Sequence, residues 1–270
     1  MYRVLVPVDT DVGRSLHQAQ YVARLAAVAG DVEATVLHVA PEWTDRHFSK
    51  VEAATDAAEY LADEGVAVRR VLEKGHVARE ILDAAAAADS HEIVMGGRKR
   101  SGVAMVVLGS TVRDVMLSAE RPVTVTGRSR VSRQATYRLL VPVDEDEARA
   151  RDQAAYVTGL PNAPEAAEVT VLYVQDSADR DEFAENDAAV AAADAIARAG
   201  IAVDRVAAAG RISRRIVGHA LERRADDVVM GGRKRSGIQN VLLGSTTQDV
   251  LLSDLHPVTI AGSGPGGSGS

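Results

Sequence analysis

The chain contains the same pattern twice, at a single offset of 135 residues (230 − 95). MGGRKRSG at residues 95–102 recurs unchanged at 230–237, and RVLVPVD at residues 3–9 recurs as RLLVPVD at 138–144. A constant offset without drift indicates a tandem duplication, and each unit has the size of a domain, not that of a solenoid repeat. The chain therefore has to fold as two copies of one domain.

Short polar segments separate and follow the two copies. We expect the domains at residues 1–127 and 137–261. Residues 128–136 are polar and lack periodicity, which predicts a linker. Residues 262–270 are rich in glycine and serine, a composition typical of a disordered tail.

Within the first unit, short apolar runs alternate with longer helical patterns. The predicted strands are residues 3–8, 33–39, 66–72, 92–95 and 123–126. The predicted helices are residues 14–29, 49–63, 77–88 and 111–118. Alternation of this kind with Val- and Ile-rich strands predicts an α/β fold, a doubly wound parallel sheet with helices on both faces. Ligands of such sheets bind beyond the carboxyl ends of the strands, where the strand order reverses.

Composition narrows the class of protein further. Only 3% of the residues are aromatic, so Val, Ala, Leu and Ile must build the cores. The formal charge of −7 argues against nucleic-acid or membrane-surface binding, and the lack of cysteine excludes disulfides and thiol chemistry. No signal peptide or membrane-length apolar run is apparent, which predicts a cytoplasmic protein. Arginine far outnumbers lysine, a bias that resembles halophilic archaeal or high-GC genomes.

The repeated basic loop follows the fourth predicted strand of each unit and leads to a helix start. Glycines let the backbone approach a ligand, the basic triplet adds charge, and the helix start attracts an anion. Together these parts predict a phosphate-binding loop in each unit. Its residues in the first unit are Met95, Gly96, Arg98, Lys99, Gly109, Ser110 and Thr111. In the second unit they are Met230, Gly231, Arg233, Lys234, Gly244, Ser245 and Thr246.

Simpler interpretations of the hydroxyl residues and of the strand ends stay open. TVRD at 111–114 and TTQD at 246–249 fit capping boxes, in which the threonines only cap helices. Asp9 and Asp144, after Val8 and Val143, could bind a ribose or assist Mg²⁺, or form a turn that caps the next helix. Val39 and Val174 could offer backbone groups to a base or belong to the core.

Catalytic motifs are missing from the sequence. The seven histidines show no metal-ligand spacing, and neither G-x-G-x-x-G nor a Walker pattern follows the first strand. No G-x-S-x-G elbow or acid/base pair occurs. The sequence therefore predicts no catalytic residues and no metal ligands of its own.

The VPVD, LHV, MGG, LGST and PVTV segments together resemble the universal stress protein family, over both units. The resemblance implies a five-stranded parallel sheet of order 3-2-1-4-5 in each unit. It also implies ATP or AMP binding, with or without Mg²⁺, through a G-x₂-G-x₉-G-[ST] loop. Gly96, Gly109 and Ser110 match that loop, whereas Lys99 and Lys234 stand at its middle glycine. The same resemblance places the aspartates named above near the ribose and the two valines near adenine.

The resemblance further implies that the two units pair through their last strands within one chain, as an intrachain pseudo-dimer that could also form a homodimer. The leading hypothesis is an adenine-nucleotide-binding stress-response protein, not an enzyme. The alternative is an interaction module with vestigial sites, in which the apolar stretches 103–108 and 238–243 are contact surfaces instead of being buried. A slow ATPase or a self-phosphorylating protein is the third hypothesis.

The only tryptophan predicts that the two sites differ. Trp43 lies four residues beyond Val39, and its counterpart in the second unit is Ala178. Trp43 could stack on a base in the first site alone, or pack on its own helix.

Overall fold

The computed structural model describes residues 1–43, 47–97, 108–127, 135–175, 183–232, 244–253 and 255–262. The strands of the first unit are β1 (Tyr2–Val8), β2 (Val32–Ala40), β3 (Ala67–Lys74), β4 (Glu92–Gly96) and β5 (Val123–Thr126). Its helices are α1 (Val12–Ala29), α2 (Glu52–Asp63), α3 (Val77–Ala87) and α4 (Ser110–Ser118), with a short 3₁₀ turn, η1 (Phe48–Lys50), before α2. The predicted boundaries differ from these by at most three residues.

The second unit repeats this order. Its strands are β6 (Tyr137–Val143), β7 (Ala167–Gln175), β8 (Ala202–Ala209), β9 (Asp227–Gly231) and β10 (Val258–Ala261). Its helices are α5 (Glu147–Thr158), α6 (Ala163–Ala166), α7 (Asp187–Arg198), α8 (Ile212–Arg223) and α9 (Ser245–Ser253), with a 3₁₀ turn, η2 (Phe183–Glu185). Of the helices in the described ranges, none is both long and apolar enough to cross a membrane.

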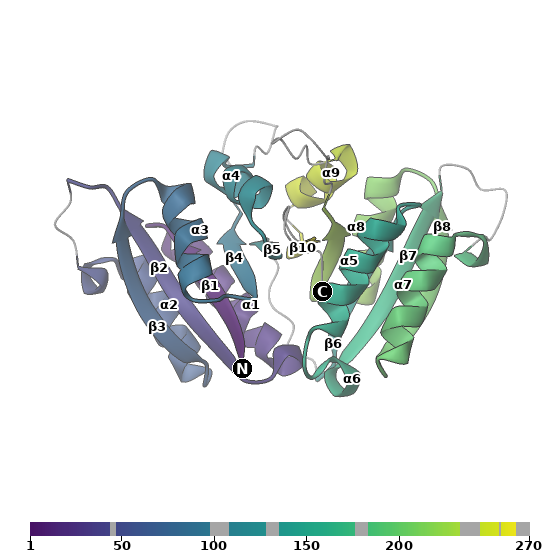
Figure 1. Cartoon of the computed structure of the whole chain (residues 1–270), viewed down its shortest axis with the longest axis horizontal. Helices are drawn as coiled ribbons and strands as arrows, with labels where there is room; N and C mark the ends of the chain where they lie inside the picture. The colour runs from purple at the N-terminus through teal and green to yellow at the C-terminus, as the bar shows by residue number, and fades with distance from the viewer. Residues whose placement is uncertain are drawn as a thin grey trace.

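All ten strands belong to one sheet, of order β3-β2-β1-β4-β5-β10-β9-β6-β7-β8 (Figure 1). Each half shows the order 3-2-1-4-5 that the resemblance implied. The two five-stranded halves join into one sheet because β5 pairs with β10 in antiparallel register, Thr124 opposite Thr259. The other strand pairs of the described sheet are parallel. The two units thus pair through their last strands within one chain.

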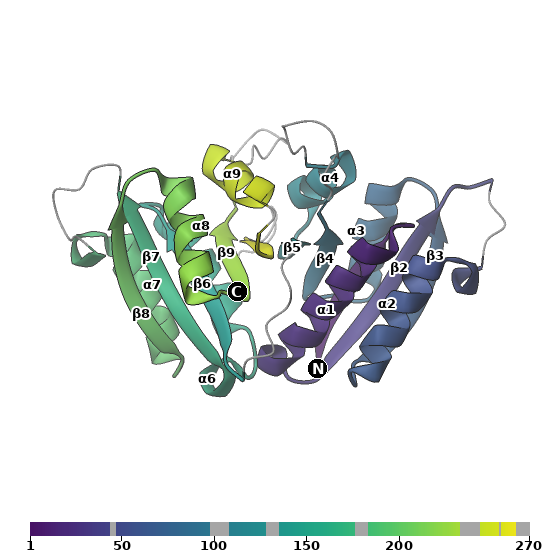
Figure 2. The ribbon, with the colours of Figure 1, turned by 180° about the vertical axis from the view of Figure 1, so that it is seen from behind.

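Each face of the sheet carries its own apolar core. One core joins α1, α2, α5 and α7, and the other joins α3, α4, α8 and α9. Alanine dominates the buried side of α2, where Ala53, Ala54, Ala57 and Ala58 face the core, and small side chains let the helix lie close to the sheet. Figure 2, seen from behind, shows α1 and α2 side by side across their half of the sheet. The low aromatic content fits this packing.

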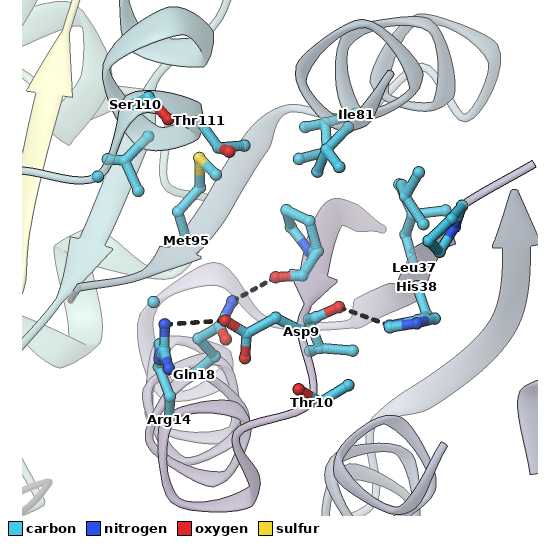
Figure 3. Close-up of a pocket in the computed structure, with 18 of the residues that line it drawn as sticks. Asp9, Thr10, Arg14, Gln18, Leu37, His38, Ile81, Met95, Ser110 and Thr111 are labelled. Carbon is cyan, nitrogen blue, oxygen red and sulfur yellow. Dashed lines mark hydrogen bonds and ion pairs between the residues drawn. The ribbon is translucent and has the colours of Figure 1, made fainter. Parts of the chain in front are cut away.

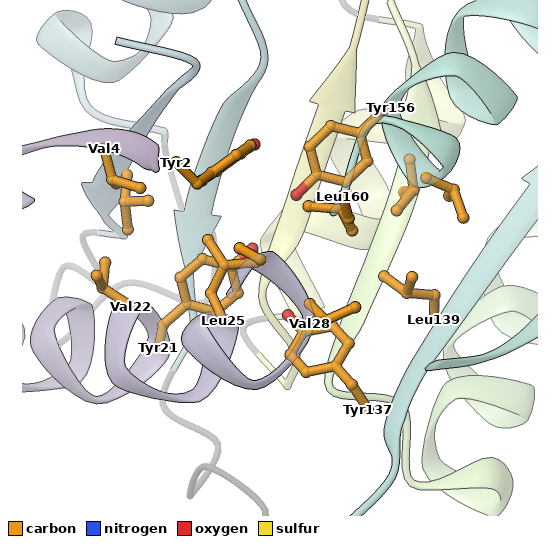
Figure 4. Packing of buried hydrophobic residues seen from close by; sticks show 14 of the residues in the cluster. Tyr2, Val4, Tyr21, Val22, Leu25, Val28, Tyr137, Leu139, Tyr156 and Leu160 are labelled. Atoms are coloured by element: carbon orange, nitrogen blue, oxygen red, sulfur yellow. The ribbon is translucent and has the colours of Figure 1, made fainter. Parts of the chain in front are cut away.

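Polar side chains are buried where β5 meets β10. We call this group the seam cluster: Glu92, Thr124, Asp227, Thr259, Tyr2, Tyr21, Tyr137 and Tyr156. Its members form pairs at the offset of 135 residues, so each unit contributes one carboxyl, one threonine and two tyrosines. The four tyrosines line the region between α1 and the second unit in Figure 4. The seam is therefore polar at its centre, although apolar residues surround it.

A row of short contacts crosses the seam. Thr124 Oγ1 lies 2.5 Å from Glu92 Oε1 and 2.6 Å from Thr259 Oγ1. Thr259 Oγ1 in turn lies 2.5 Å from Asp227 Oδ2. Burial raises the pKa of Glu92, and raises the pKa of Asp227 to about 7.

A second polar contact at the seam has no counterpart. Arg24 of α1 forms an ion pair of 3.0 Å with Asp226 of the second unit, and both side chains are more than nine-tenths buried. Arg24 Nη2 also donates to the carbonyl of Thr136, and the backbone N–H of Arg138 donates to Asp226. The position equivalent to Asp226 in the first unit holds His91, which stacks on Tyr2 instead. The duplication has diverged at this point.

Candidate functional site

A cavity of about 530 Å³ opens at the carboxyl ends of β1, β2 and β4 in the first unit. This edge is the point where the strand order reverses between β1 and β4, the usual place for a ligand in such sheets. Figure 3 shows Ser110 and Thr111 of α4 above Met95, and Asp9 and Arg14 on the opposite side. We call this cavity the first pocket.

The first pocket brings together eight of the residues predicted for the first unit. They are Val8, Asp9, Val39, Met95, Gly96, Gly109, Ser110 and Thr111. Arg98 and Lys99 lie outside the described residues, and so do Arg233 and Lys234. Of the two apolar stretches, only Leu108 is described, and it packs partly buried against the core that includes α3 and α4. Both interpretations of the two stretches therefore stay predictions.

The second unit places its predicted residues at equivalent points. Val143 ends β6 and Asp144 follows it, Val174 is the penultimate residue of β7, and Met230 and Gly231 end β9. Gly244, Ser245 and Thr246 stand at the start of α9. The two units thus present the same side chains at the same edge of the sheet.

Helix α4 begins with a glycine, not with a threonine. Gly109 is its N-cap residue, and within the described residues no side chain caps the first turn. Thr111 is the second residue of the helix, so the capping-box interpretation of residues 111–114 is wrong for this unit. The start of α4 faces the first pocket, and no side chain in the described part of the chain caps its backbone N–H groups.

Asp9 forms a turn but does not cap α1. Its Oδ1 accepts from the backbone N–H of Asp11 at 2.9 Å, and its Oδ2 lies 2.8 Å from Arg14 Nη1. The N-cap is Asp11, whose Oδ1 accepts from the backbone N–H of Arg14 at 3.0 Å. The helix therefore starts two residues earlier than the sequence predicted. The hydrogen bond to Arg14 also lowers the pKa of Asp11.

The second unit repeats this arrangement. Asp144 accepts from the backbone N–H of Asp146 at 3.0 Å, and Asp146 caps α5. Arg149 lies 2.5 Å from Asp144 and 2.8 Å from Asp146. The aspartate after the first strand is thus part of the same turn in both halves.

The glycine at the end of β4 makes room for an arginine. A Cβ on Gly96 would lie 2.3 Å from Cγ of Arg14 and 3.0 Å from Oε1 of Gln18. A Cβ on Gly231 would lie 2.9 Å from Cβ of Arg149. The lack of a Cβ at these glycines leaves space for the arginine side chain of α1 or α5, and the close approach of a ligand to them stays a prediction.

Three polar residues of the first pocket escaped the sequence analysis. Gln18 donates to the carbonyls of Pro7 and Val94, 2.8 Å each, and so ties β1 to β4 below the pocket. His38 Nδ1 lies 3.0 Å from the carbonyl of Val8. Arg14 is the third. A signal was present for two of them, because Arg14 and Gln18 both recur at the offset of the duplication, as Arg149 and Gln153.

The edge of the first pocket near β2 is open. Trp43 lines it and is 87% exposed, which contradicts the interpretation of a tryptophan packed on its own helix. Val39 also lines it but does not end its strand, because β2 continues to Ala40. Ala178, the counterpart of Trp43, lies outside the described residues.

Comparison with known proteins decides the family. The model of the universal stress protein family matches residues 1–127 and 136–261. The chain belongs to the universal stress protein family.

Solved universal stress proteins share the fold over nearly the whole chain. One from Archaeoglobus fulgidus DSM 4304 has a TM-score of 0.73 and 23% identity, and covers 97% of this chain and 98% of its own. A functionally unknown protein from Pseudomonas aeruginosa PAO1 has a TM-score of 0.67 and 20% identity, with 97% and 92% covered. A shorter universal stress protein from Archaeoglobus fulgidus, solved in complex with dAMP, covers 46% of this chain and 97% of its own, with a TM-score of 0.37 and 24% identity. No curated protein matches.

Proposed function

We propose that this universal stress protein binds an adenine nucleotide in the first pocket and acts as a regulatory protein of the stress response. One observation carries the proposal: an aspartate, a helix start that no described side chain caps, and the open end of β2 surround one cavity of about 530 Å³. That volume lies within the range of about 300–1,000 Å³ that is usual for small-molecule sites.

The chemistry of the walls assigns an orientation to the nucleotide. Phosphates fit the start of α4 at Gly109 and Ser110, because the helix dipole and the backbone N–H groups favour an anion there. The ribose hydroxyls can donate to Asp9. Adenine then reaches the apolar end, where Val39 and Ile81 line the pocket beside Trp43.

The second unit supports a second nucleotide site, made from Asp144, Gly231 and the start of α9. Its loop carries an alanine where the first unit has Trp43. A base stacked on an aromatic ring gains roughly 1–3 kcal/mol in nucleic-acid complexes, so we expect the first site to bind more tightly.

Equilibrium dialysis with labelled ATP and AMP, with and without Mg²⁺, tests the proposal. We expect saturable binding, and quenching or enhancement of the Trp43 emission as the first pocket fills. Absence of binding at millimolar nucleotide in every condition would contradict the proposal.

The interaction module with vestigial sites stays the second candidate, and one observation favours it. Arg14 already neutralises Asp9 and fills the space over Gly96. In that case a partner protein would bind equally well with and without nucleotide, and to the Asp9→Asn variant. Pull-down in the presence of ATP distinguishes this candidate from the first.

A further inference from the structure

Arg14 occupies a position in the first pocket that neither the family resemblance nor the proposed function assigns. We propose that Arg14 makes the pocket selective for phosphorylated ligands, by exchanging its ion pair with Asp9 for one with the phosphate of the bound nucleotide. This inference rests on the proposed function and adds the residue that recognises the ligand class.

The position of Arg14 is fixed from two sides. Its Nη1 lies 2.8 Å from Asp9 Oδ2, and its Nη2 lies 2.7 Å from Asp11 Oδ2. Its methylene stem lies over Gly96, so close that a Cβ there would collide with it. Only 18% of the side chain is exposed. The guanidinium is therefore held beside Gly96 at the end of β4, on the wall of the pocket that faces Ser110 (Figure 3), and in this proposal the phosphate lies between the two, in contact with both Arg14 and the start of α4.

Ligand and arginine compete for the same carboxylate. Ribose hydroxyls that donate to Asp9 must share or displace the guanidinium that lies 2.8 Å from it. The contact of Arg14 with Asp9 joins two charged groups, whereas a ribose hydroxyl is neutral, so a nucleoside that displaces the guanidinium leaves Arg14 without one of its two anionic partners. A nucleotide carries a phosphate, and this anion can replace Asp9 as the partner of the Arg14 guanidinium.

Asp11 lets the exchange occur without loss of position. Arg14 presents five N–H donors, and those that face Asp11 can keep their partner while the others turn to phosphate. Asp11 is itself fixed, because it caps α1 through the backbone N–H of Arg14. Only the contact of Arg14 with Asp9 has to be replaced by a contact with the phosphate.

The second unit contains the same arrangement of one arginine, two aspartates and a glycine. Arg149 bridges Asp144 and Asp146, and its side chain lies over Gly231. An arginine that only points into solvent from a helix start has no reason to pack on a glycine and pair with two aspartates. Both units therefore hold this arginine in the same defined position.

The Arg14→Met variant tests the proposal, because methionine keeps an unbranched stem over Gly96 and removes the charge. AMP and adenosine are titrated separately while the emission of Trp43 reports on the first pocket. We expect the Kd for AMP to rise about tenfold or more, the loss typical of a charged hydrogen bond, while the Kd for adenosine stays equal or falls. The preference for AMP over adenosine then shrinks by about tenfold.

Arg79→Met is the matched control, since it removes one exposed arginine and its ion pair with Asp83 from α3. It should leave both titrations unchanged. Arg14→Lys, which keeps the charge but loses the planar fork, should fall between wild type and Arg14→Met, and serves if the methionine variant does not fold.

Two results would overturn the inference. If Arg14→Met, or Arg14→Lys in its place, changed the Kd for AMP and adenosine by the same factor, Arg14 would only support the pocket. If wild type bound AMP no better than adenosine, no selectivity would exist to explain. Wild type that binds neither ligand contradicts the proposed function itself, and this inference falls with it.

Discussion

The two units keep the same motif residues at the carboxyl edge of the sheet and differ where the units meet. Glu92 of the first unit accepts hydroxyl hydrogen bonds from Tyr2, Tyr21, Tyr156 and Thr124, a set that spans both units. Its counterpart Asp227 is one methylene shorter and lies within hydrogen-bond distance of only two described hydroxyls, those of Tyr21 and Thr259. Its Oδ1 and the hydroxyl of Tyr137 have no hydrogen-bond partner among the described residues. The carboxyl group of the first unit, Glu92, therefore makes most of the hydrogen bonds at the polar centre of the seam.

The row of contacts across the seam also indicates how the two buried carboxyl groups are protonated. Three oxygen–oxygen contacts of 2.5–2.6 Å connect Glu92 to Asp227 through Thr124 and Thr259. The two threonine hydroxyls supply only two hydrogens for these three contacts. A third proton, on one of the two carboxyl groups, completes the row. The raised pKa of Asp227, about 7, agrees with such a proton.

The largest expected difference between the units concerns the ion pair of Arg24 with Asp226. Asp226→Ala leaves a buried guanidinium without its carboxylate, which typically costs about 3–5 kcal/mol of unfolding free energy. His91→Ala, at the equivalent position of the first unit, removes a partly exposed ring and should cost about 1 kcal/mol or less. Urea denaturation measures both. Equal losses would show that the two positions do not differ as the structure implies.

The second difference is a dependence of stability on pH. The folded protein holds the Asp227 proton more tightly than the unfolded chain does, so this group stabilises the fold fully below about pH 4. That contribution is lost as the pH rises toward about 7. Asp227→Asn should remove this dependence, and above pH 7 it should exceed wild type in stability by an amount on the order of a few kcal/mol.

The groups that face Asp227 set the control for this experiment. They are Glu92, Tyr21, Tyr137, Tyr156 and Tyr2, with Arg24 and Asp226 beyond them. Glu92→Gln places an amide where four hydroxyls donate, and it should destabilise the protein at every pH. Parallel stability curves of wild type and Asp227→Asn from pH 4 to 8 would rule out a buried proton on Asp227.

A third difference concerns the two proposed nucleotide sites. Trp43→Ala should weaken nucleotide binding at the first site by roughly 1–3 kcal/mol, the contribution of one base–aromatic stack. The second site has no tryptophan to lose, so biphasic binding curves should become closer to a single phase. Isothermal calorimetry on wild type and variant measures this. A variant that retains two unequal sites would assign the asymmetry to another residue.

The smallest expected difference lies at the helix ends before β4 and β9. Asp89 and Arg224 are equivalent, and both adopt positive φ, 44° and 53°. Arg224→Gly relieves the left-handed backbone and should stabilise the protein by about 0.5–1 kcal/mol. Asp89→Gly also loses the ion pair with Arg3 and should be closer to neutral. Thermal unfolding compares the two, and a reversed order would contradict this assignment.

Hydrophobic pattern and turn chemistry were sufficient to predict the strands, the helices and the position of the pocket. Asp9, Gly96 and Gly109 mark strand and helix ends that local sequence determines. The joining of the two sheets was not predictable from the residues themselves, because a four-residue strand such as β5 carries no signal for its partner. It followed only from the family resemblance, which implied that the units pair through their last strands.

The residues that the sequence analysis did not identify were missed for the same reason, which is that their role depends on tertiary contacts. Arg14 stands in the first turn of a helix, where arginine is normally solvated, and only the tertiary contact with Gly96 reveals its place. Glu92 begins a strand and looks like a polar boundary residue, yet it is fully buried. Burial of this kind depends on the other unit, which no local window of sequence contains. The predicted halophilic source has no bearing on these contacts and stays a prediction.

The antiparallel pairing of β5 with β10 makes assembly of the two units a unimolecular event. Two separate chains would have to meet by diffusion, and their association would depend on how much protein the cell makes. Within one chain the linker fixes a high effective concentration of each half for the other. The two halves are also always present in a one-to-one ratio. Each half can therefore accumulate its own substitutions without having to select the correct partner from a mixture of subunits. The unequal seam is a difference that such a fixed pair permits, and the proposed inequality of the two sites would be another.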